Sequence, residues 1–165
     1  MDEERLARLE ARLLRLEDEL AITRLVASYG PLVDAGEAEA VAGLWADDGA
    51  YDVEGWQMTS RADIRAMVES DGHQGLIGGG CSHFLGPAQV HVHGDEAIAV
   101  CESLLVRHRE GSYSVRRAGA NHFHLRRERD GWRIAHRTTR ALDGSAEARD
   151  LLSKGALGRA TGGVL

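Results

Sequence analysis

The sequence has few cysteines, no excess of basic residues and no long apolar run. Its two cysteines, Cys81 and Cys101, are too few and too widely spaced for a disulfide framework or a cysteine-rich metal site, so we expect small buried thiols. The formal net charge of −6 argues against nucleic acid or an anionic membrane as the main partner. No apolar segment approaches the length of a membrane span, and the charged N-terminus does not resemble a signal peptide. These features predict a cytoplasmic protein.

The chain of 165 residues is long enough for one domain with a substantial core. A hydrophobic share of 43% and a charged share of 28% are typical of a globular protein. We therefore expect a single domain over residues 1–165, with a helical extension over 1–20 and a C-terminal tail over 143–165.

The first half of the chain has the periodicity of helices. Residues 3–29 carry a heptad-like seam on a helix that is otherwise charged, made of Leu6, Leu9, Leu13, Leu16 and Leu20. Little of the chain itself is left to cover this seam, so we expect a homo-oligomer. Gly30-Pro31 interrupts the helical pattern, which ends at Asp34-Ala35-Gly36. A short helix over 37–46 and a helix capped by Ser60 should follow, and the five glycines within 71–80 predict a mobile loop.

From residue 81 onward the hydrophobic period changes to two, which is typical of strands. We expect a short strand over 50–55, long strands over 81–93, 97–110, 113–129 and 132–141, and a short helix over 145–154. Asp130-Gly131 is a strong hairpin signal between the last two strands. This order predicts an α+β fold, a cone-shaped α+β barrel in which N-terminal helices pack on a strongly curved antiparallel sheet and enclose a pocket.

An aspartate and a histidine are candidates for a general base. Asp34 lies on an otherwise apolar helix face, His83 lies at the start of the first long strand, and His108 lies on the second. A carboxylate behind an imidazole fixes its tautomer and stabilises the imidazolium that forms when the ring accepts a proton. A structural hydrogen bond between helix and sheet is an equally good interpretation of Asp34 and His83 taken alone.

The order of elements and four motifs resemble the SnoaL-like branch of the nuclear transport factor 2-like superfamily, over about residues 15–142. The motifs are Tyr29-Gly-Pro-Leu-Val-Asp34, Leu44-Trp45-Ala46-Asp47-Asp48-Gly49-Ala50, His83-Phe84-Leu85-Gly86 and Asp130-Gly131-Trp132-Arg133-Ile134. Within this branch the chain is most similar to the group of scytalone dehydratase, bile acid dehydratase and hexachlorocyclohexane dehydrochlorinase.

The resemblance implies specific roles for several residues. In that group an aspartate at the end of the first helix supports a strand histidine that removes a proton during an elimination, and these residues match Asp34 and His83. The resemblance also implies catalytic donors at Tyr29 and His108, a substrate-binding arginine at Arg140, and a trimer rather than a dimer. The water-holding tyrosines of scytalone dehydratase fall on Val33 and Val53, which argues against its substrate.

The pocket should be lined by residues from several elements. Val53, Trp56 and Phe84 are expected as pocket walls. On the third long strand, strict alternation turns Asn121 inward, whereas comparison with scytalone dehydratase turns His122 inward, and both remain candidates. His91 and His93 share a strand face without a third ligand, so we expect no metal.

These observations favour a cofactor-independent lyase that carries out a dehydratase-like elimination on a small, hydrophobic, hydroxylated cyclic substrate. An isomerase of the ketosteroid-isomerase kind, with Asp34 carrying the proton, is the enzymatic alternative. The fold also hosts non-catalytic modules that bind small ligands, which is the third interpretation.

Overall fold

We describe residues 2–161 of the protein from a computed structural model. Its helices and strands are α1 (Glu3–Asp34), α2 (Ala38–Ala42), β1 (Trp45–Val53), β2 (Trp56–Met58), α3 (Arg61–Glu69), α4 (Asp71–Gly78), β3 (Cys81–Leu85), β4 (Gln89–His93), β5 (Glu96–Arg109), β6 (Ser112–Glu128), β7 (Gly131–Ala141) and α5 (Ala146–Ala156). Within the part of the chain that is described, no helix is long and apolar enough to cross a membrane.

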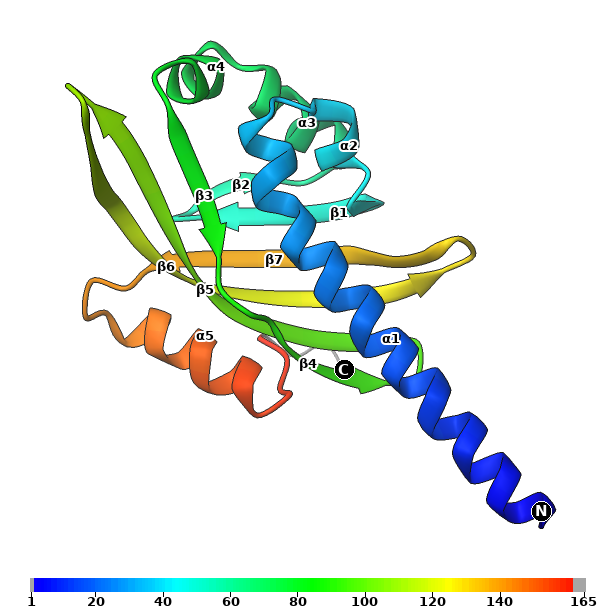
Figure 1. Ribbon diagram of the computed structural model, residues 1–165. Helices are drawn as coiled ribbons and strands as arrows, with labels where there is room; N and C mark the ends of the chain where they lie inside the picture. Colours follow the sequence, from blue (N-terminus) through cyan, green and yellow to red (C-terminus); the bar gives the residue numbers. More distant parts are fainter. Residues whose placement is uncertain (1, 162–165) are drawn as a thin grey trace.

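One curved sheet holds all the strands in the order β2-β1-β7-β6-β5-β3, and β4 also pairs with β5. The long strands β5, β6 and β7 bend across the molecule, and helices cover the sheet (Figure 1). The expected α+β fold with helices on a curved sheet is confirmed, but the sheet does not close. The pairing of β1 with β7 is parallel, which departs from the purely antiparallel sheet expected.

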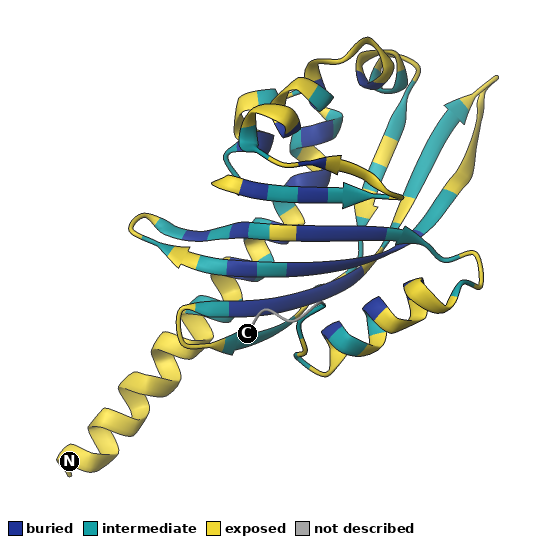
Figure 2. Ribbon diagram, turned by 180° about the vertical axis from the view of Figure 1, so that it is seen from behind, coloured by how far each residue is buried: buried dark blue, intermediate teal, exposed yellow. Residues whose placement is uncertain are grey.

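The two faces of the sheet carry different layers. Ala97, Ala99 and Cys101 of β5 point into the main core, where Ile22 and Val26 of α1 pack. On the opposite face α5 covers a second, smaller core made of Ala120, Ala148 and Leu151. Figure 2 shows the buried middle of the sheet in dark blue and the exposed N-terminal part of α1 in yellow. The inward face toward α1 is therefore the face that can enclose a site.

A β-bulge in β7 reverses which residues face the core. Ile134 is opposite Leu125, but His136 is opposite His124, so Ala135 is an extra residue on β7. Because side chains alternate along a strand, one extra residue transfers all later side chains to the other face. Before the bulge Trp132 and Ile134 are in the core, and after it the odd-numbered residues point inward.

Two expected interruptions of helical structure are wrong. Pro31 lies inside α1, which continues to Asp34, because a proline removes one backbone donor but its φ is compatible with a helix. Residues 71–78 form α4 instead of a mobile loop. Ser70 caps this helix, and buried His73 anchors it through a 3.0 Å hydrogen bond from Nε2 to the backbone oxygen of Val33.

The strand predictions are largely confirmed, with two changes of boundary. The expected strand 81–93 is divided into β3 and β4, and the first strand begins at Trp45 instead of residue 50. The Ser60 cap is confirmed by a hydrogen bond from Asp63 N to Ser60 Oγ at 3.1 Å. The helix expected over 145–154 is α5, capped by Ser145.

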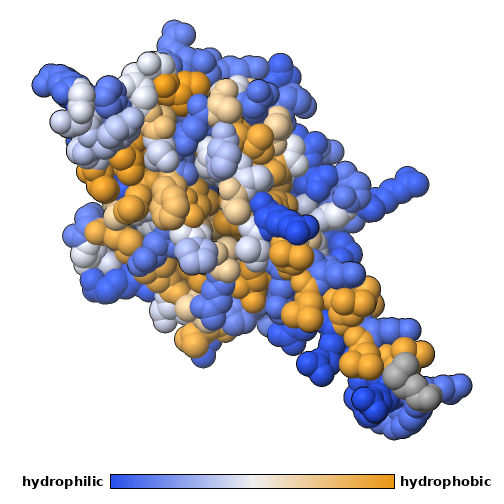
Figure 3. Space-filling view, in the orientation of Figure 1, coloured by the Kyte–Doolittle hydropathy of each residue, from blue (hydrophilic) through white to orange (hydrophobic). Residues whose placement is uncertain are grey.

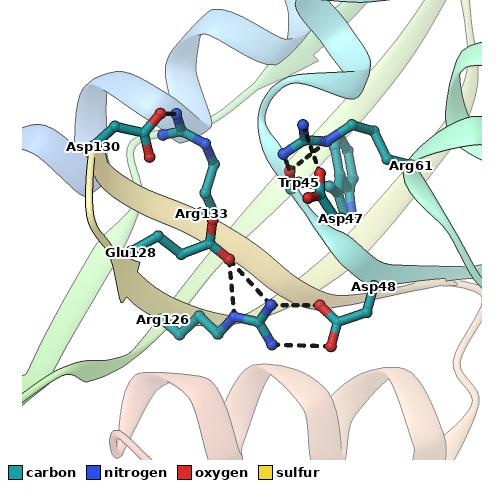
Figure 4. A network of polar contacts seen from close by, with 8 residues as sticks. All are labelled: Trp45, Asp47, Asp48, Arg61, Arg126, Glu128, Asp130 and Arg133. Carbon is teal, nitrogen blue, oxygen red and sulfur yellow. Dashed lines mark hydrogen bonds and ion pairs between the residues drawn. The ribbon is translucent and has the colours of Figure 1, made fainter.

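Ion pairs on the surface connect β1 to its neighbours (Figure 4). Arg126 of β6 lies between Asp48 of β1 and Glu128 of its own strand. Arg61 of α3 donates from Nε to the backbone oxygen of Trp45 at 3.0 Å. These contacts tie the start of β1 to β6 and to α3, although exposed ion pairs contribute little to stability.

Gly30 allows α1 to approach β3 closely. A Cβ atom at Gly30 would overlap the backbone oxygen of His83. Backbone atoms of an edge strand cannot move aside as a flexible side chain can. The close approach of helix and strand at this point therefore requires glycine.

We predict that Gly30→Ala lowers the free energy of unfolding by about 1–3 kcal/mol, the usual cost of overpacking a well-packed region. Gly75→Ala is the matched control, since Gly75 is also helical and a Cβ there would meet nothing within 4 Å. The control should be neutral or slightly stabilising, because alanine favours helix over glycine by about 0.5–1 kcal/mol. Urea denaturation of both variants measures this, and equal effects would contradict the role given to Gly30.

Candidate active site

The carboxylate of Asp34, at the end of α1, forms two hydrogen bonds with His83. Its Oδ1 lies 2.5 Å from His83 Nδ1, and its Oδ2 accepts the backbone N–H of His83 at 2.7 Å. Because β3 is an edge strand, this N–H has no neighbouring strand on that side, and the carboxylate satisfies it. Two contacts from one carboxylate fix both the strand and the ring.

With Asp34 ionised, the shared proton lies on His83 Nδ1, which leaves Nε2 with a free lone pair. His83 is one of the residues that line a pocket of roughly 560 Å³, including its open mouth. Burial lowers the pKa of His83 from its usual 6.5, and the bond to Asp34 opposes this shift. The imidazole is therefore neutral at neutral pH and can accept a proton.

The pocket lies between α1, α3 and the inner face of the sheet. Its apolar wall is made by Val53, Trp56, Met58, Met67, Leu85, Leu104 and Leu105. Its polar groups are Tyr29, Tyr51, His83, Ser103, Arg117 and Arg137. An apolar cavity with a few polar groups is the usual form of a site for a small molecule.

Arg137 is a buried cation at the base of this pocket, with 2% of its surface exposed. Its guanidinium carbon lies 4.2 Å from the ring centre of Tyr29 and 4.5 Å from that of Tyr51. Nη2 donates to Asn121 Oδ1 at 2.8 Å, whereas Nε and Nη1 have no hydrogen-bond partner among the described residues. Unsatisfied buried donors are costly, so an oxygen that contacted these nitrogens would be bound favourably; because both atoms have almost no accessible surface, such a contact requires neighbouring side chains to shift.

Asn121 holds Arg137 in place. It accepts a second hydrogen bond from Thr139 Oγ1 at 2.8 Å, and its Nδ2 donates to Ser103 Oγ at 2.9 Å. Asn121 thus faces inward, as strict alternation predicts, although it lies behind Arg137 and not on the pocket surface.

Tyr29 stands beside His83, with ring centres 6.4 Å apart. Burial raises the pKa of Tyr29 above its usual value of 10, so its hydroxyl keeps its proton and remains a donor. Tyr51 completes the aromatic surroundings of Arg137, and its hydroxyl oxygen lies 3.3 Å from Thr139 Oγ1.

Cys81 joins the same cluster, because its thiol donates to Asp34 Oδ1 at 3.5 Å. Burial raises the pKa of Cys81 to about 11, which keeps the thiol protonated. The donor atoms of Asp34, Cys81 and His83 lie within 4.8 Å of one another and could each offer one ligand to a cation. The hydrogen bonds among them account for the same arrangement.

Four residues expected in the pocket lie elsewhere. His108, His122, Phe84 and Arg140 all point to the outer face of the sheet. Side chains alternate along β3, so Phe84 points away from the face on which its neighbour His83 lines the pocket. His108 follows Leu105 by three residues on β5, so it points outward, where its ring packs at an angle against that of Tyr113 with ring centres 5.0 Å apart.

The other two corrections also follow from the alternation of side chains. His122 is opposite Val100, on the face that α5 covers, and its Nε2 bonds the backbone oxygen of Arg159 at 2.8 Å. Arg140 forms ion pairs with Asp52 at 2.8 Å and Glu147 at 2.7 Å.

The structure gathers other expected residues and adds some that the sequence analysis missed. Tyr29, Val53 and Trp56 line the pocket as expected. Arg137 and Tyr51 also line the pocket, and they were not predicted from the sequence. The bulge at Ala135 explains why Arg137 could not be predicted. Trp132 and Ile134 face the core, so unbroken alternation would turn Arg140 inward and Arg137 outward, whereas the extra residue reverses both.

Comparison with known proteins identifies the domain family of this chain and a related structure. The family model of the SnoaL-like domain matches residues 14–138. An NTF2-like protein with a cystatin-like fold from Novosphingobium aromaticivorans is 47% identical over 89% of this chain and 96% of its own, with a TM-score of 0.87. The comparison with curated proteins gives no match.

More distant structures share the fold alone. A protein of unknown function from Mycobacterium tuberculosis is 22% identical over 88% of each chain, with a TM-score of 0.70. The β subunit of a provisionally named aromatic-ring-hydroxylating dioxygenase from Novosphingobium aromaticivorans is 21% identical over 78% of this chain and 91% of its own, with a TM-score of 0.64.

We predict that Asp34→Asn lowers the pKa of His83 further, by about one unit or more, equivalent to roughly 1.4 kcal/mol. The substitution keeps the size of the side chain but removes the charge that favours the imidazolium. NMR titration of the ring, assigned with His83→Gln, measures the shift. Asp130→Asn, which removes a charge from the surface turn, is the control, and an unchanged His83 titration in Asp34→Asn would refute the coupling.

Proposed function

Because this chain belongs to the SnoaL-like domain family, which includes enzymes, we propose that it is a cofactor-independent lyase with His83 as its general base. The observation that carries the proposal is the bond between Asp34 and His83 at a pocket lined by Arg137, a buried arginine whose Nε and Nη1 have no hydrogen-bond partner among the described residues. The proposed reaction is the elimination of water from a small, hydrophobic, hydroxylated cyclic compound.

In the first step Nε2 of His83 removes a proton from a carbon next to a substrate carbonyl. Asp34 keeps the ring in the tautomer that exposes Nε2, and it stabilises the imidazolium after proton transfer. Burial and the positive charge of Arg137 lower the pKa of His83, which keeps the base free of its proton before the reaction.

Arg137 is suited to stabilise the enolate that this step produces. Nε and Nη1 are already desolvated and have no competing protein partner among the described residues. A donor fixed in position before the reaction stabilises developing charge without the cost of reorganisation. Arg137 takes the role that the family resemblance assigned to Arg140.

The departing hydroxyl needs a proton, and His108 is not in the pocket to supply it. Tyr29 has a protonated hydroxyl near His83, and the imidazolium of His83 itself carries a proton after the first step. We assign protonation of the leaving group to one of these two groups.

The isomerase remains a second candidate because the described pocket contains no second histidine. An isomerisation needs one base that removes a proton and returns it at another carbon, together with a donor to the enolate. His83 and Arg137 supply both, so His83 would replace Asp34 as the group that carries the proton. Elimination and isomerisation then share their first step, and they differ in whether a leaving group is present.

A panel of β-hydroxy ketones and hydroxylated cyclic compounds tests the proposal. NMR in deuterated water detects both proton exchange next to the carbonyl and loss of water. We expect His83→Gln to reduce the rate by about 10²–10⁴-fold, and Arg137→Gln by about 10²–10³-fold. His108→Asn is the matched control on the outer face and should change the rate by less than about threefold.

Each outcome of this panel has a clear meaning. Proton exchange without loss of water, dependent on His83, would favour the isomerase. Binding without exchange or turnover across the whole panel would refute both enzymes and favour the binding module. A large effect of His108→Asn in a folded protein would contradict the assignment of His83 as the base in this pocket.

The pH dependence follows from the lowered pKa of His83. The reaction requires neutral imidazole, so kcat/KM should stay high above this pKa and fall as the pH drops through it. We expect the midpoint of this acid limb to lie below pH 6.5. In Asp34→Asn the midpoint should move to a still lower pH, because the charge that favours the imidazolium is removed. A limb that rises toward low pH would contradict a histidine base.

A further inference from the structure

The leucine seam of α1 is exposed in the single chain. Its members expose between 42% and 60% of their surface: Leu6, Leu9, Leu13, Leu16 and Leu20. Figure 3 shows hydrophobic side chains along the part of α1 that projects from the body. A continuous row of large apolar side chains is unusual on a free surface and indicates a binding partner.

The body of the protein lies on the other side of this helix. If Leu6 and Leu13 occupy position a of a heptad, Asp18 occupies position f, opposite the seam. Asp18 accepts hydrogen bonds from Arg127 Nη1 and Nη2, both at 2.7 Å, and from Trp132 Nε1 at 2.9 Å. The seam is therefore turned away from the sheet of its own chain.

The charges beside the seam identify the partner and its direction. In a parallel pair of identical helices, position g of one helix faces position e of the next heptad of the other. All three such contacts in this sequence join opposite charges: Arg5 with Glu10, Arg12 with Glu17, and Glu19 with Arg24. By symmetry each contact occurs twice in a dimer.

An antiparallel pair would lose part of this complementarity, because it sets e against e and g against g. The antiparallel alignment that matches the leucine layers places Glu10 opposite Glu17 twice on one side of the pair, and it keeps attraction only on the other side, where Arg12 lies opposite Glu19. Like charges across an interface are unfavourable and select against that arrangement.

We propose that the seam binds a second copy of this chain in a parallel, in-register coiled coil. The parallel register buries the leucines of both helices, makes every g–e contact attractive and leaves the two bodies outside the pair. A third copy, as in the trimer expected from the family resemblance, would meet the same g–e contacts. This assembly is independent of the proposed reaction.

Leu13 and Leu14 provide a matched pair of variants. They expose 57% and 61% of their surface, but only Leu13 lies in the seam. Sedimentation equilibrium at micromolar concentration should show an oligomer for the wild type and for Leu14→Glu. The dissociation constant of the Leu13→Glu oligomer should be at least about 100-fold higher than that of the wild type, because the substitution places charge in an apolar interface. A monomeric wild type, or equal behaviour of the two variants, would overturn the proposal.

A charge exchange tests the parallel register. One variant carries Glu10→Arg with Glu17→Arg, and the other carries Arg5→Glu with Arg12→Glu. Each variant alone faces like charges and should be monomeric, whereas an equimolar mixture should associate, because all four altered contacts again join opposite charges. Circular dichroism confirms that both variants fold. Self-association of either variant, or no association of the mixture, would refute the parallel arrangement.

Discussion

The contact between Asp34 and His83 is the constraint on which the rest of the site depends. One carboxylate joins the end of α1 to the free edge of β3, and it holds both the backbone and the ring of the histidine. This is possible only because Gly30 lets the helix lie directly on the strand. The same contact serves the fold, by satisfying an edge N–H, and the proposed chemistry, by exposing Nε2 to the pocket. The two roles are separable, since only the chemical role requires the pocket beside the ring.

Arg137 indicates that the site is more than a structural link. A buried guanidinium with two nitrogens that have no partner among residues 2–161 destabilises a fold, and cation–π contacts with Tyr29 and Tyr51 offset only part of that cost. A purely structural core would be more stable with an apolar residue at this position. The cost is understandable if a ligand oxygen completes the coordination of these nitrogens. The arginine also favours neutral His83, so one cation helps both the base and the enolate.

The sequence predicted much of the fold, because local signals determine it. Ser60 and Ser145 cap helices as expected, and the alternation from residue 81 gives the strands. The failures have a common physical origin in contacts between distant residues. A glycine-rich segment becomes α4 because His73 reaches the backbone of Val33, and Arg137 faces inward because of one extra residue at Ala135. A bulge has no reliable signature in an alternating pattern, and it reverses every later side chain.

Helix α1 both packs against the body of the protein and presents the leucine seam. These two roles use different faces and different parts of its length. Toward its C-terminal end Ile22, Val26 and Tyr29 are buried in the body, and Asp34 reaches the strand edge. Near the middle, Asp18 fixes the rotation of the helix through Arg127 and Trp132. That rotation determines which side of the projecting N-terminal part faces outward. The buried half of the helix therefore directs the leucine seam away from the sheet, so the packing that positions the candidate base also orients the surface proposed for assembly.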